Sequence, residues 1–466
     1  MMASSYKLAQ DIPKNIFRAY DIRGIVGETF TPDNIYTIGL AIGSEAIKRG
    51  ERTIIIGRDG RLSGPELLKA LSAGILSSGC NVINIGEVTT PILYYATNVL
   101  DTTSGVMLTG SHNPPNYNGI KVVLQGEALY EMGIYNLHDK IVKKDFVCGE
   151  GKEEFKEIID QYLARIVGDV KLSKKLKIVI DCGNGVGGKV APKLFKALGC
   201  DVIELFCEVD GNFPNHHPDP SEEKNLEDLV QSVLANKADA GLAFDGDADR
   251  VGVVTNEGKI ISSDRLLMFF AIDLLSRKPN ATIVFDVKCT RHLADQITRH
   301  EGQPLMMRTG HSYIKAKMKE IKALLAGEFS GHTFIKERWY GFDDGIYTGA
   351  RLLELLAKSE QSLDQLFAVL PESLHTPELK IPMADDLKFA FMEKLQNRAH
   401  FPDAKVTTID GIRADFADGF GLIRPSNTTP YLILRFEGDT KEALDKIKRV
   451  FKSQLQLLNP NLKLPY

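Results

Sequence analysis

The chain has 466 residues, more than one ordinary domain of about 100 to 200 residues, which predicts three or four domains. Its 43% hydrophobic and 25% charged residues are typical of a globular protein, and no stretch approaches the roughly 20 apolar residues of a membrane span. The 57 basic residues nearly balance the 61 acidic ones, so the net charge of -4 gives no reason to expect nucleic-acid binding. We therefore expect neither a membrane nor a nucleic acid as a partner.

The first twenty residues contain no apolar signal-peptide core. The six cysteines show no CxxC or other spacing typical of metal ligands. Together these features predict a protein of the reducing cytoplasm.

Three segments share one pattern: a β-branched strand, a polar or glycine-containing turn, a helix that ends near glycine, and a second apolar strand. They are residues 53–86, 177–206 and 282–310. Each is followed by a short strand that leads into an unusual polar segment, respectively TGSHNP, DGDADR and GEFSGH. Such units predict parallel or mixed sheets covered by helices, with ligands beyond the carboxyl ends of the strands. Three unrelated α/β units with similar loops are the alternative.

The segment after the first repeat, TGSHNPPNYNGIK, places Ser111 and His112 in an irregular turn bounded by glycine and proline. A hydroxyl in such a turn can project and be modified covalently, although a serine there is also consistent with a helix N-cap. Lys121, and Arg23 in the earlier segment FRAYDIRG, are candidates for proton transfer or charge stabilisation. Exposed side chains of these types are often only solvated.

The second repeat contains three glycines, Gly183, Gly185 and Gly188, that match the GxGxxG pattern of dinucleotide-binding proteins. Asp181, however, would lie at the strand end close to a bound pyrophosphate. We therefore interpret this segment as a structural turn and keep a dehydrogenase as the less favoured reading.

The segment DGDADR follows the second repeat and alternates three acids, Asp245, Asp247 and Asp249, whose carboxylates can converge on one hard cation. Mg²⁺ is the expected ion. An EF-hand is excluded, since that loop needs glycine where Arg250 stands. A phosphoryl group on Ser111 would supply a fourth oxygen ligand. A solvated acidic turn is the alternative.

The third repeat leads into GEFSGH, in which Glu328, Ser330 and His332 alternate. In an extended loop the three side chains would leave one face. A carboxylate is a good bidentate acceptor for vicinal hydroxyls, so this segment predicts a sugar-binding loop.

Residues 371–382 are rich in proline and predict a connection into a smaller α+β domain. Its segment RPSNTTP offers a guanidinium, hydroxyls and backbone N–H groups suited to a phosphate, from Arg424, Ser426, Asn427 and Thr428. In the last helix we expect Asp439 as the N-cap, followed by an apolar stripe of Leu444, Ile447, Phe451 and Leu455.

Taken in order, FRAYDIRG, TGSHNP, DGDADR, GEFSGH and RPSNTTP resemble the α-D-phosphohexomutase superfamily along essentially the whole chain. Among its branches the chain is most similar to the bacterial bifunctional phosphomannomutase/phosphoglucomutases. The resemblance implies three related mixed-sheet α/β domains and a mobile C-terminal α+β domain, similar to the TATA-box-binding protein, around a central cleft. We expect their boundaries at residues 1–157, 158–259, 260–370 and 371–466.

The resemblance also implies an isomerase that interconverts hexose 1-phosphate and hexose 6-phosphate of mannose and glucose. It would use phosphoserine at Ser111, Mg²⁺ on the three aspartates, and a hexose 1,6-bisphosphate as intermediate and activator. The implied catalytic residues are Ser111, His112, Lys121, Arg23, Arg250 and His332. The implied substrate contacts are Tyr20, Lys288, His311, Glu328, Ser330, His332, Arg424, Ser426, Asn427 and Thr428.

Alternatives to this function remain at the level of the sequence. A phosphoglucosamine mutase commonly has GEQSGH, where this chain has Phe329. A Mg²⁺-dependent sugar phosphatase would also use the acidic loop. We expect a monomer that binds small hexose phosphates. Ala248 stands where close relatives often have glycine. Alanine would restrict the proposed metal-binding loop, DGDADR, if that position requires a positive φ.

Overall fold

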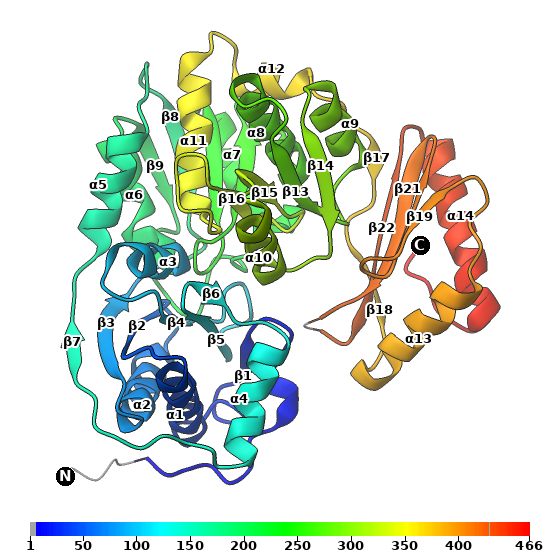
Figure 1. The fold of residues 1–466 in the computed structure, drawn as a ribbon. Helices are drawn as coiled ribbons and strands as arrows, with labels where there is room; N and C mark the ends of the chain where they lie inside the picture. Colours follow the sequence, from blue (N-terminus) through cyan, green and yellow to red (C-terminus); the bar gives the residue numbers. More distant parts are fainter. Residues whose placement is uncertain (1–5, 428) are drawn as a thin grey trace. The chain divides into compact units, whose positions relative to one another are not determined.

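The computed structural model describes residues 6–427 and 429–466, which form two compact units. Unit 1 contains the described residues up to Ser263 together with Ser330–Leu366. Unit 2 contains Asp264–Phe329 and Phe367–Tyr466. Figure 1 shows sheets and helices in both units. No helix in the described part of the chain is long and apolar enough to cross a membrane.

Unit 1 begins with a seven-stranded mixed sheet of order β1-β5-β4-β2-β3-β7, with β6 beside β5. The central strand β2 runs parallel to β3 and β4, while β5 is antiparallel to β4. The strands are β1 (Ile22–Ile25), β2 (Thr53–Arg58), β3 (Asn81–Glu87), β4 (Gly105–Leu108), β5 (Tyr117–Leu124), β6 (Glu127–Ala128) and β7 (Glu153–Phe155). The helices are α1 (Pro32–Lys48), α2 (Gly64–Ser77), α3 (Thr90–Val99) and α4 (Met132–Val142), after the 3₁₀ helix η1 (Lys14–Ile16).

The second sheet of unit 1 has the order β12-β11-β10-β8-β9. Its strands are β8 (Lys177–Asp181), β9 (Asp201–Leu205), β10 (Ala240–Phe244), β11 (Val251–Thr255) and β12 (Ile260–Ile261). The helical segments are α5 (Ile159–Asp169), η2 (Val186–Lys189), α6 (Ala191–Ala197), η3 (Glu223–Leu226) and α7 (Glu227–Asn236). The short strand β16 (Thr333–Ile335) and helix α11 (Gly345–Lys358) also belong to unit 1.

Unit 2 contains a parallel set of strands in which β13 (Thr282–Asp286) pairs with β14 (Gln303–Met307) and β15 (Leu325–Gly327). Its helices are α8 (Ser263–Arg277), α9 (Arg291–Arg299) and α10 (His311–Ile321). Helix α8 begins at Ser263, the last residue of unit 1 before Asp264, and α12 (Leu363–Ala368) crosses the boundary between Leu366 and Phe367.

The C-terminal part of unit 2 is an antiparallel sheet with two helices, as expected of an α+β domain. Strand β22 pairs with β17, β18 and β21, and β21 continues to β20 and β19. The strands are β17 (Leu374–His375), β18 (Leu379–Pro382), β19 (Lys405–Thr407), β20 (Ile412–Phe416), β21 (Gly419–Pro425) and β22 (Tyr431–Gly438). The helices are α13 (Asp385–Arg398) and α14 (Lys441–Leu458).

The three predicted repeats form the expected elements: β2-α2-β3, β8-α6-β9 and β13-α9-β14. Of the strands after them, β4 and β10 end directly before TGSHNP and DGDADR, and β15 ends at Gly327, the first residue of GEFSGH. The predicted α/β class with mixed sheets is therefore confirmed. The prediction that Asp439 caps the last helix is wrong, because Thr440 is the N-cap of α14 and its side chain accepts a hydrogen bond from the Ala443 N–H.

Candidate active site

Ser111 lies in the loop between β4 and β5, beyond the end of a buried strand. Its side chain is almost fully buried, its φ is 48°, and it begins no helix, so the N-cap alternative is wrong. Its Oγ donates a hydrogen bond of 2.8 Å to Oδ2 of Asp245 and lies 3.2 Å from Nδ1 of His112. The predicted nucleophile therefore lies against the first acid of DGDADR, although 134 residues separate them in the chain.

Glycine is required where the two loops meet. A Cβ atom added to Gly246 would lie 2.4 Å from the carbonyl oxygen of Ser111, a distance that no real contact allows. The glycine-rich turn of the second repeat supports the same loop, since Val186 N–H donates to the Gly246 carbonyl at 3.2 Å. That turn is structural in this protein, as its interpretation from the sequence predicted.

Asp245, Asp247 and Asp249 follow β10 and are all fully buried. They form a group whose ligand atoms all lie within 4.8 Å of one another. Ala248 between them has φ 60°, the left-handed conformation in which a side chain is disfavoured.

A hard cation fits this acidic group. Carboxylate oxygens are the ligands that Mg²⁺ prefers. Oδ1 of Asp247 and Oδ1 of Asp249 are buried with no hydrogen-bond partner among the residues that the structure describes. Buried carboxylate oxygens without a hydrogen bond are costly, so a bound cation would stabilise them.

Lys121 on β5 lies inside the acidic group, with Nζ 2.8 Å from Oδ2 of Asp247 and 2.6 Å from Oδ2 of Asp249. Burial opposes its charge, but these two carboxylates outweigh burial and raise the pKa of Lys121 well above its ordinary value. Burial, followed by repulsion from the other two aspartates, raises the pKa of the Asp245 carboxyl well above its ordinary value. Four buried ionisable groups are thus coupled within one site.

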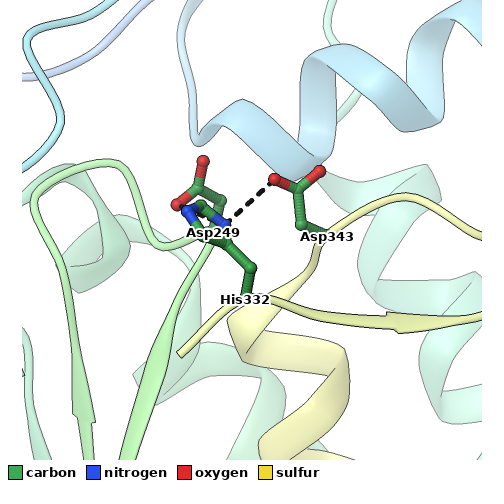
Figure 2. A group of neighbouring side chains, drawn as sticks. All are labelled: Asp249, His332 and Asp343. Carbon is green, nitrogen blue, oxygen red and sulfur yellow. Dashed lines mark ion pairs between the residues drawn. The ribbon is translucent and has the colours of Figure 1, made fainter. Parts of the chain in front are cut away.

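A second group joins Asp249 to residues near β16. His332 Nδ1 lies 3.1 Å from Oδ2 of Asp343 and 3.5 Å from Oδ1 of Asp249. Figure 2 shows the three side chains, with the contact between His332 and Asp343 dashed. Arg250 Nε donates to His332 Nε2 at 3.0 Å, so the ring accepts at Nε2 and carries its proton at Nδ1.

Two residues of this site were missed in the sequence. Thr90, the first residue of α3, donates from Oγ1 to Oδ2 of Asp247 at 2.5 Å and from its N–H to the Asp247 carbonyl. Asp343, described above, holds the imidazole of His332. Thr90 has no chemical signal of its own, whereas Asp343 belongs to the paired acids of FDDGIY.

We call residues 109–117, which run from the end of β4 to the first residue of β5 and include Ser111, the serine loop. Arg23, at the edge strand β1, contacts this loop by donating a hydrogen bond to the side chain of Asn113. It also forms a short ion pair with Asp21. Tyr20, half-buried, lies just before β1. Burial, followed by the charge of Arg250, lowers the pKa of His112 well below its ordinary value. In unit 1 the structure therefore brings Ser111, His112, Lys121, the three aspartates, Arg250 and His332 together, with Arg23 beside the serine loop.

Ser330 is half-buried and lies in unit 1, whereas the predicted substrate residues Lys288, His311, Glu328, Arg424, Ser426 and Asn427 lie in unit 2. Lys288 is paired with Glu378 at 2.8 Å, and Glu328 accepts a hydrogen bond of 2.6 Å from the Gly310 N–H, next to the buried His311. In the predicted phosphate loop, Arg424 Nε donates to Asp410 at 2.8 Å, and Ser426 Oγ accepts from the Thr429 N–H at 3.1 Å. Asn427 lies in the same loop, and Thr428 lies outside the described residues.

Four domain profiles match the chain in order. The phosphoglucomutase/phosphomannomutase alpha/beta/alpha domains I, II and III match residues 14–145, 160–258 and 262–373, and the C-terminal domain of the same family matches residues 378–453. The chain belongs to the phosphoglucomutase/phosphomannomutase family. Family membership accounts for the order of the five motifs along the chain.

Curated relatives of this family match over almost their full length. A phosphomannomutase/phosphoglucomutase of Pseudomonas putida is 57% identical over 98% of this chain and 98% of its own. A phosphoglucomutase of Neisseria gonorrhoeae is 52% identical over 97% of this chain and 99% of its own. A probable phosphoglucosamine mutase of Methanosarcina acetivorans is 35% identical over 96% and 100%. The chain is thus more similar to the first two proteins than to the third.

A solved structure supports the fold. The phosphoglucomutase/phosphomannomutase family protein of Burkholderia thailandensis is 49% identical, covers 98% of this chain, and superimposes with a TM-score of 0.94. The phosphoglucomutase parafusin of Paramecium has a TM-score of 0.78 at 17% identity, which shows a shared fold alone.

Proposed function

We propose that this protein is a phosphohexomutase that interconverts the 1-phosphates and 6-phosphates of mannose and glucose. Ser111 would carry the phosphoryl group and donate it to the free hydroxyl of a bound hexose monophosphate. The resulting hexose 1,6-bisphosphate would turn around in the site and return its other phosphoryl group to Ser111. A trace of hexose 1,6-bisphosphate would therefore activate dephosphorylated enzyme.

One observation carries this proposal: the hydroxyl of Ser111 lies 2.8 Å from a carboxylate of a buried three-aspartate cluster. A serine that exchanges phosphoryl groups needs a fixed hydroxyl and compensation for the charge that develops during transfer. The turn fixes the hydroxyl, and the cations Lys121 and Arg250 lie around the acids.

Asp245, Asp247 and Asp249 would hold Mg²⁺, with a phosphoryl oxygen on Ser111 as a further ligand. The ion would supply charge stabilisation during phosphoryl transfer. The choice of Mg²⁺ rests on the all-oxygen donor set and on the family resemblance.

Proton transfer at the reacting hydroxyl needs side chains that hold or move a proton. Lys121 and His332 are the proposed general base and acid. His332 is oriented by Asp343 at Nδ1 and by Arg250 at Nε2. Arg23 contacts the serine loop through Asn113 and would assist charge stabilisation, and His112 adjoins the nucleophile.

Recognition of the sugar and of the distal phosphate is assigned by resemblance. Glu328 and Ser330 would bind ring hydroxyls, and Arg424, Ser426, Asn427 and Thr428 would bind the phosphate that does not react. Tyr20, Lys288 and His311 would add further contacts. One site must accept the substrate in two opposite orientations, so these contacts should bind groups common to both. A monomeric state and a cytoplasmic location belong to the same proposal.

The test is a coupled assay of mannose 1-phosphate and glucose 1-phosphate with Mg²⁺ and a trace of glucose 1,6-bisphosphate. We expect conversion of both to their 6-phosphates. Ser111→Ala should lose at least about a thousandfold in turnover, because the phosphoryl carrier is missing, yet still bind glucose 6-phosphate. Ser104→Ala is the matched control, since Ser104 is also buried in unit 1 and donates to a carboxylate, that of Glu51.

Each alternative has its own outcome in this assay. Turnover of glucosamine 6-phosphate alone would move the assignment to a phosphoglucosamine mutase. Stoichiometric release of inorganic phosphate would indicate a phosphatase. Full activity in Ser111→Ala would remove Ser111 from the mechanism.

A further inference from the structure

Arg61 donates hydrogen bonds to the backbone of the loop that carries Ser111. It lies outside the five motifs of the sequence. It lies in the turn after β2, and its side chain is almost fully buried. Its two terminal nitrogens donate to four backbone carbonyls of the loop. The acceptors are the carbonyl oxygens of Ser111 at 2.8 Å, Asn113 at 2.6 Å, Pro114 at 2.6 Å and Tyr117 at 2.9 Å.

The remaining Nε–H of Arg61 donates to Oδ2 of Asp59 at 3.2 Å. All five N–H groups of the guanidinium are therefore used, which is the full donor capacity of arginine. Lysine has three donors on a single nitrogen and cannot reach carbonyls that are spread along seven residues of a loop.

Asp59 holds the part of the serine loop that precedes Ser111. Its Oδ2 accepts from Thr109 Oγ1 at 2.8 Å and from the Gly110 N–H at 3.1 Å. Thr109 Oγ1 in turn accepts from the Ser111 N–H at 2.8 Å. The backbone of Ser111 is thus held at its N–H through Thr109 and Asp59, and at its carbonyl by Arg61.

The guanidinium of Arg61 packs tightly against the backbone of the serine loop. A Cβ atom on Gly110 would lie 2.3 Å from Nε of Arg61, so the guanidinium fills the space below the loop. The ring of Phe213 covers the guanidinium at 5.2 Å. Ser111 itself has φ 48°, a conformation that an L-residue leaves unless its neighbours hold it.

We propose that Arg61 is a positioning residue for phosphoryl transfer. It touches no reacting atom. It holds the loop in the one conformation that keeps Ser111 Oγ within hydrogen-bond distance of Asp245. Because Arg61 acts on the nucleophile and not on the sugar, its loss should lower kcat and leave substrate binding nearly unchanged.

The inference rests on the proposed mutase function and predicts a pattern that a merely stabilising arginine would not give. In Arg61→Lys we expect kcat to fall at least about a hundredfold, since misplacement of a reacting group by about 1 Å has effects of that size. KM for glucose 1-phosphate should change less than about threefold, as expected when ground-state binding is kept. Phosphorylation of Ser111 by glucose 1,6-bisphosphate, followed by ³¹P NMR, should slow in proportion to kcat.

Chemical rescue distinguishes a role of Arg61 in positioning the serine loop from a role in the stability of the fold. Guanidinium at low millimolar concentration should raise kcat of Arg61→Gly at least about tenfold, because the ion refills the cavity and its hydrogen bonds. The control is Arg351→Gly, which removes another buried arginine of unit 1, paired with Glu354 at 3.0 Å and far from the serine loop in sequence. Guanidinium should leave its kcat unchanged.

The inference is overturned if Arg61→Lys retains the parental kcat per folded molecule, or if its whole loss appears in KM. It is equally overturned if guanidinium restores both glycine variants alike. Should Arg61→Gly fail to fold, Arg61→Lys decides the matter. A parental enzyme that converts neither hexose phosphate would sink the proposed function, whereas an active parent with an equally active Arg61→Lys sinks only this inference.

Discussion

Ser111 and Ala248 have left-handed backbone conformations, with φ 48° and φ 60°. For an L-residue with a Cβ atom this conformation costs about 1 to 2 kcal/mol. Such strain persists only where the surroundings determine the conformation, and it is concentrated at functional sites. Ala248 does have the positive φ on which the predicted restriction of its loop depends.

An ion pair between half-buried His216 and fully buried Asp181 predicts a pH dependence of stability. His216 Nε2 lies 2.9 Å from Oδ2 of Asp181, at the end of β8. Burial opposes the charge of His216, but the Asp181 carboxylate outweighs burial and raises the pKa of His216 above its ordinary value. A raised folded-state pKa means that the pair stabilises fully below about pH 6.5 and is lost as the pH rises through the folded pKa.

The measurement is urea unfolding of the parent and of His216→Gln from pH 6 to pH 8.5. The parent should exceed the variant in free energy of unfolding at pH 6, and the difference should shrink as the pH rises. Asp181→Asn should abolish the same pH-dependent part. A difference that grows with pH would contradict a raised pKa for His216.

At the scale of elements, strand ends carry the chemistry. Strands β4 and β10 belong to two different sheets, and each ends just before the loop that carries Ser111 or Asp245. Folding brings these two side chains within 2.8 Å of each other. Repeated strand and helix patterns therefore predicted these positions well. Helix ends were less predictable: in the adjacent pair Asp439 and Thr440 both residues are good caps by type, and only the backbone path decides between them.

The cap of α14 predicts a stability change. Thr440 Oγ1 accepts from the Ala443 N–H at 3.2 Å. Thr440→Ala should lower the free energy of unfolding of the C-terminal sheet and its helices by about 1 kcal/mol, since one N–H of the first turn loses its partner. Thr440→Ser keeps the hydroxyl and should change stability by less than about half of that. Equal losses in both variants, measured by thermal unfolding, would show that the methyl group matters and the cap does not.

At the scale of the whole molecule, the chain forms two compact units, and the acidic cluster lies entirely in unit 1. An ion that binds only the folded form stabilises it by about 2.7 kcal/mol at a free concentration a hundred times its Kd. Mg²⁺ should therefore slow hydrogen exchange in peptides that span β10 and β11. Peptides that span β20 and β21 of unit 2 should exchange at an unchanged rate.

Asp247→Asn should abolish this protection because it removes a proposed ligand. Asp415→Asn is the control: Asp415 is a carboxylate of unit 2 paired with Arg413 at 2.9 Å, and its loss should leave the response to Mg²⁺ intact. Protection by Mg²⁺ in Asp247→Asn equal to that of the parent would contradict a cation site at the three aspartates.

The sequence by itself determined the α/β class, the order of the motifs, and the two loops with Ser111 and the aspartates. These features are local, because residue type, strand periodicity and position at a strand end are all written within a few residues. Only the tertiary structure decided that Thr90 donates to Asp247 across 157 residues, that Asp343 orients His332, and that Arg61 holds the serine loop. Nothing in the residue type of Thr90, Asp343 or Arg61 predicts these contacts. Each contact depends on which side chains folding brings next to that residue. These contacts are determined by the packing of segments that are distant in the sequence, which no local pattern encodes.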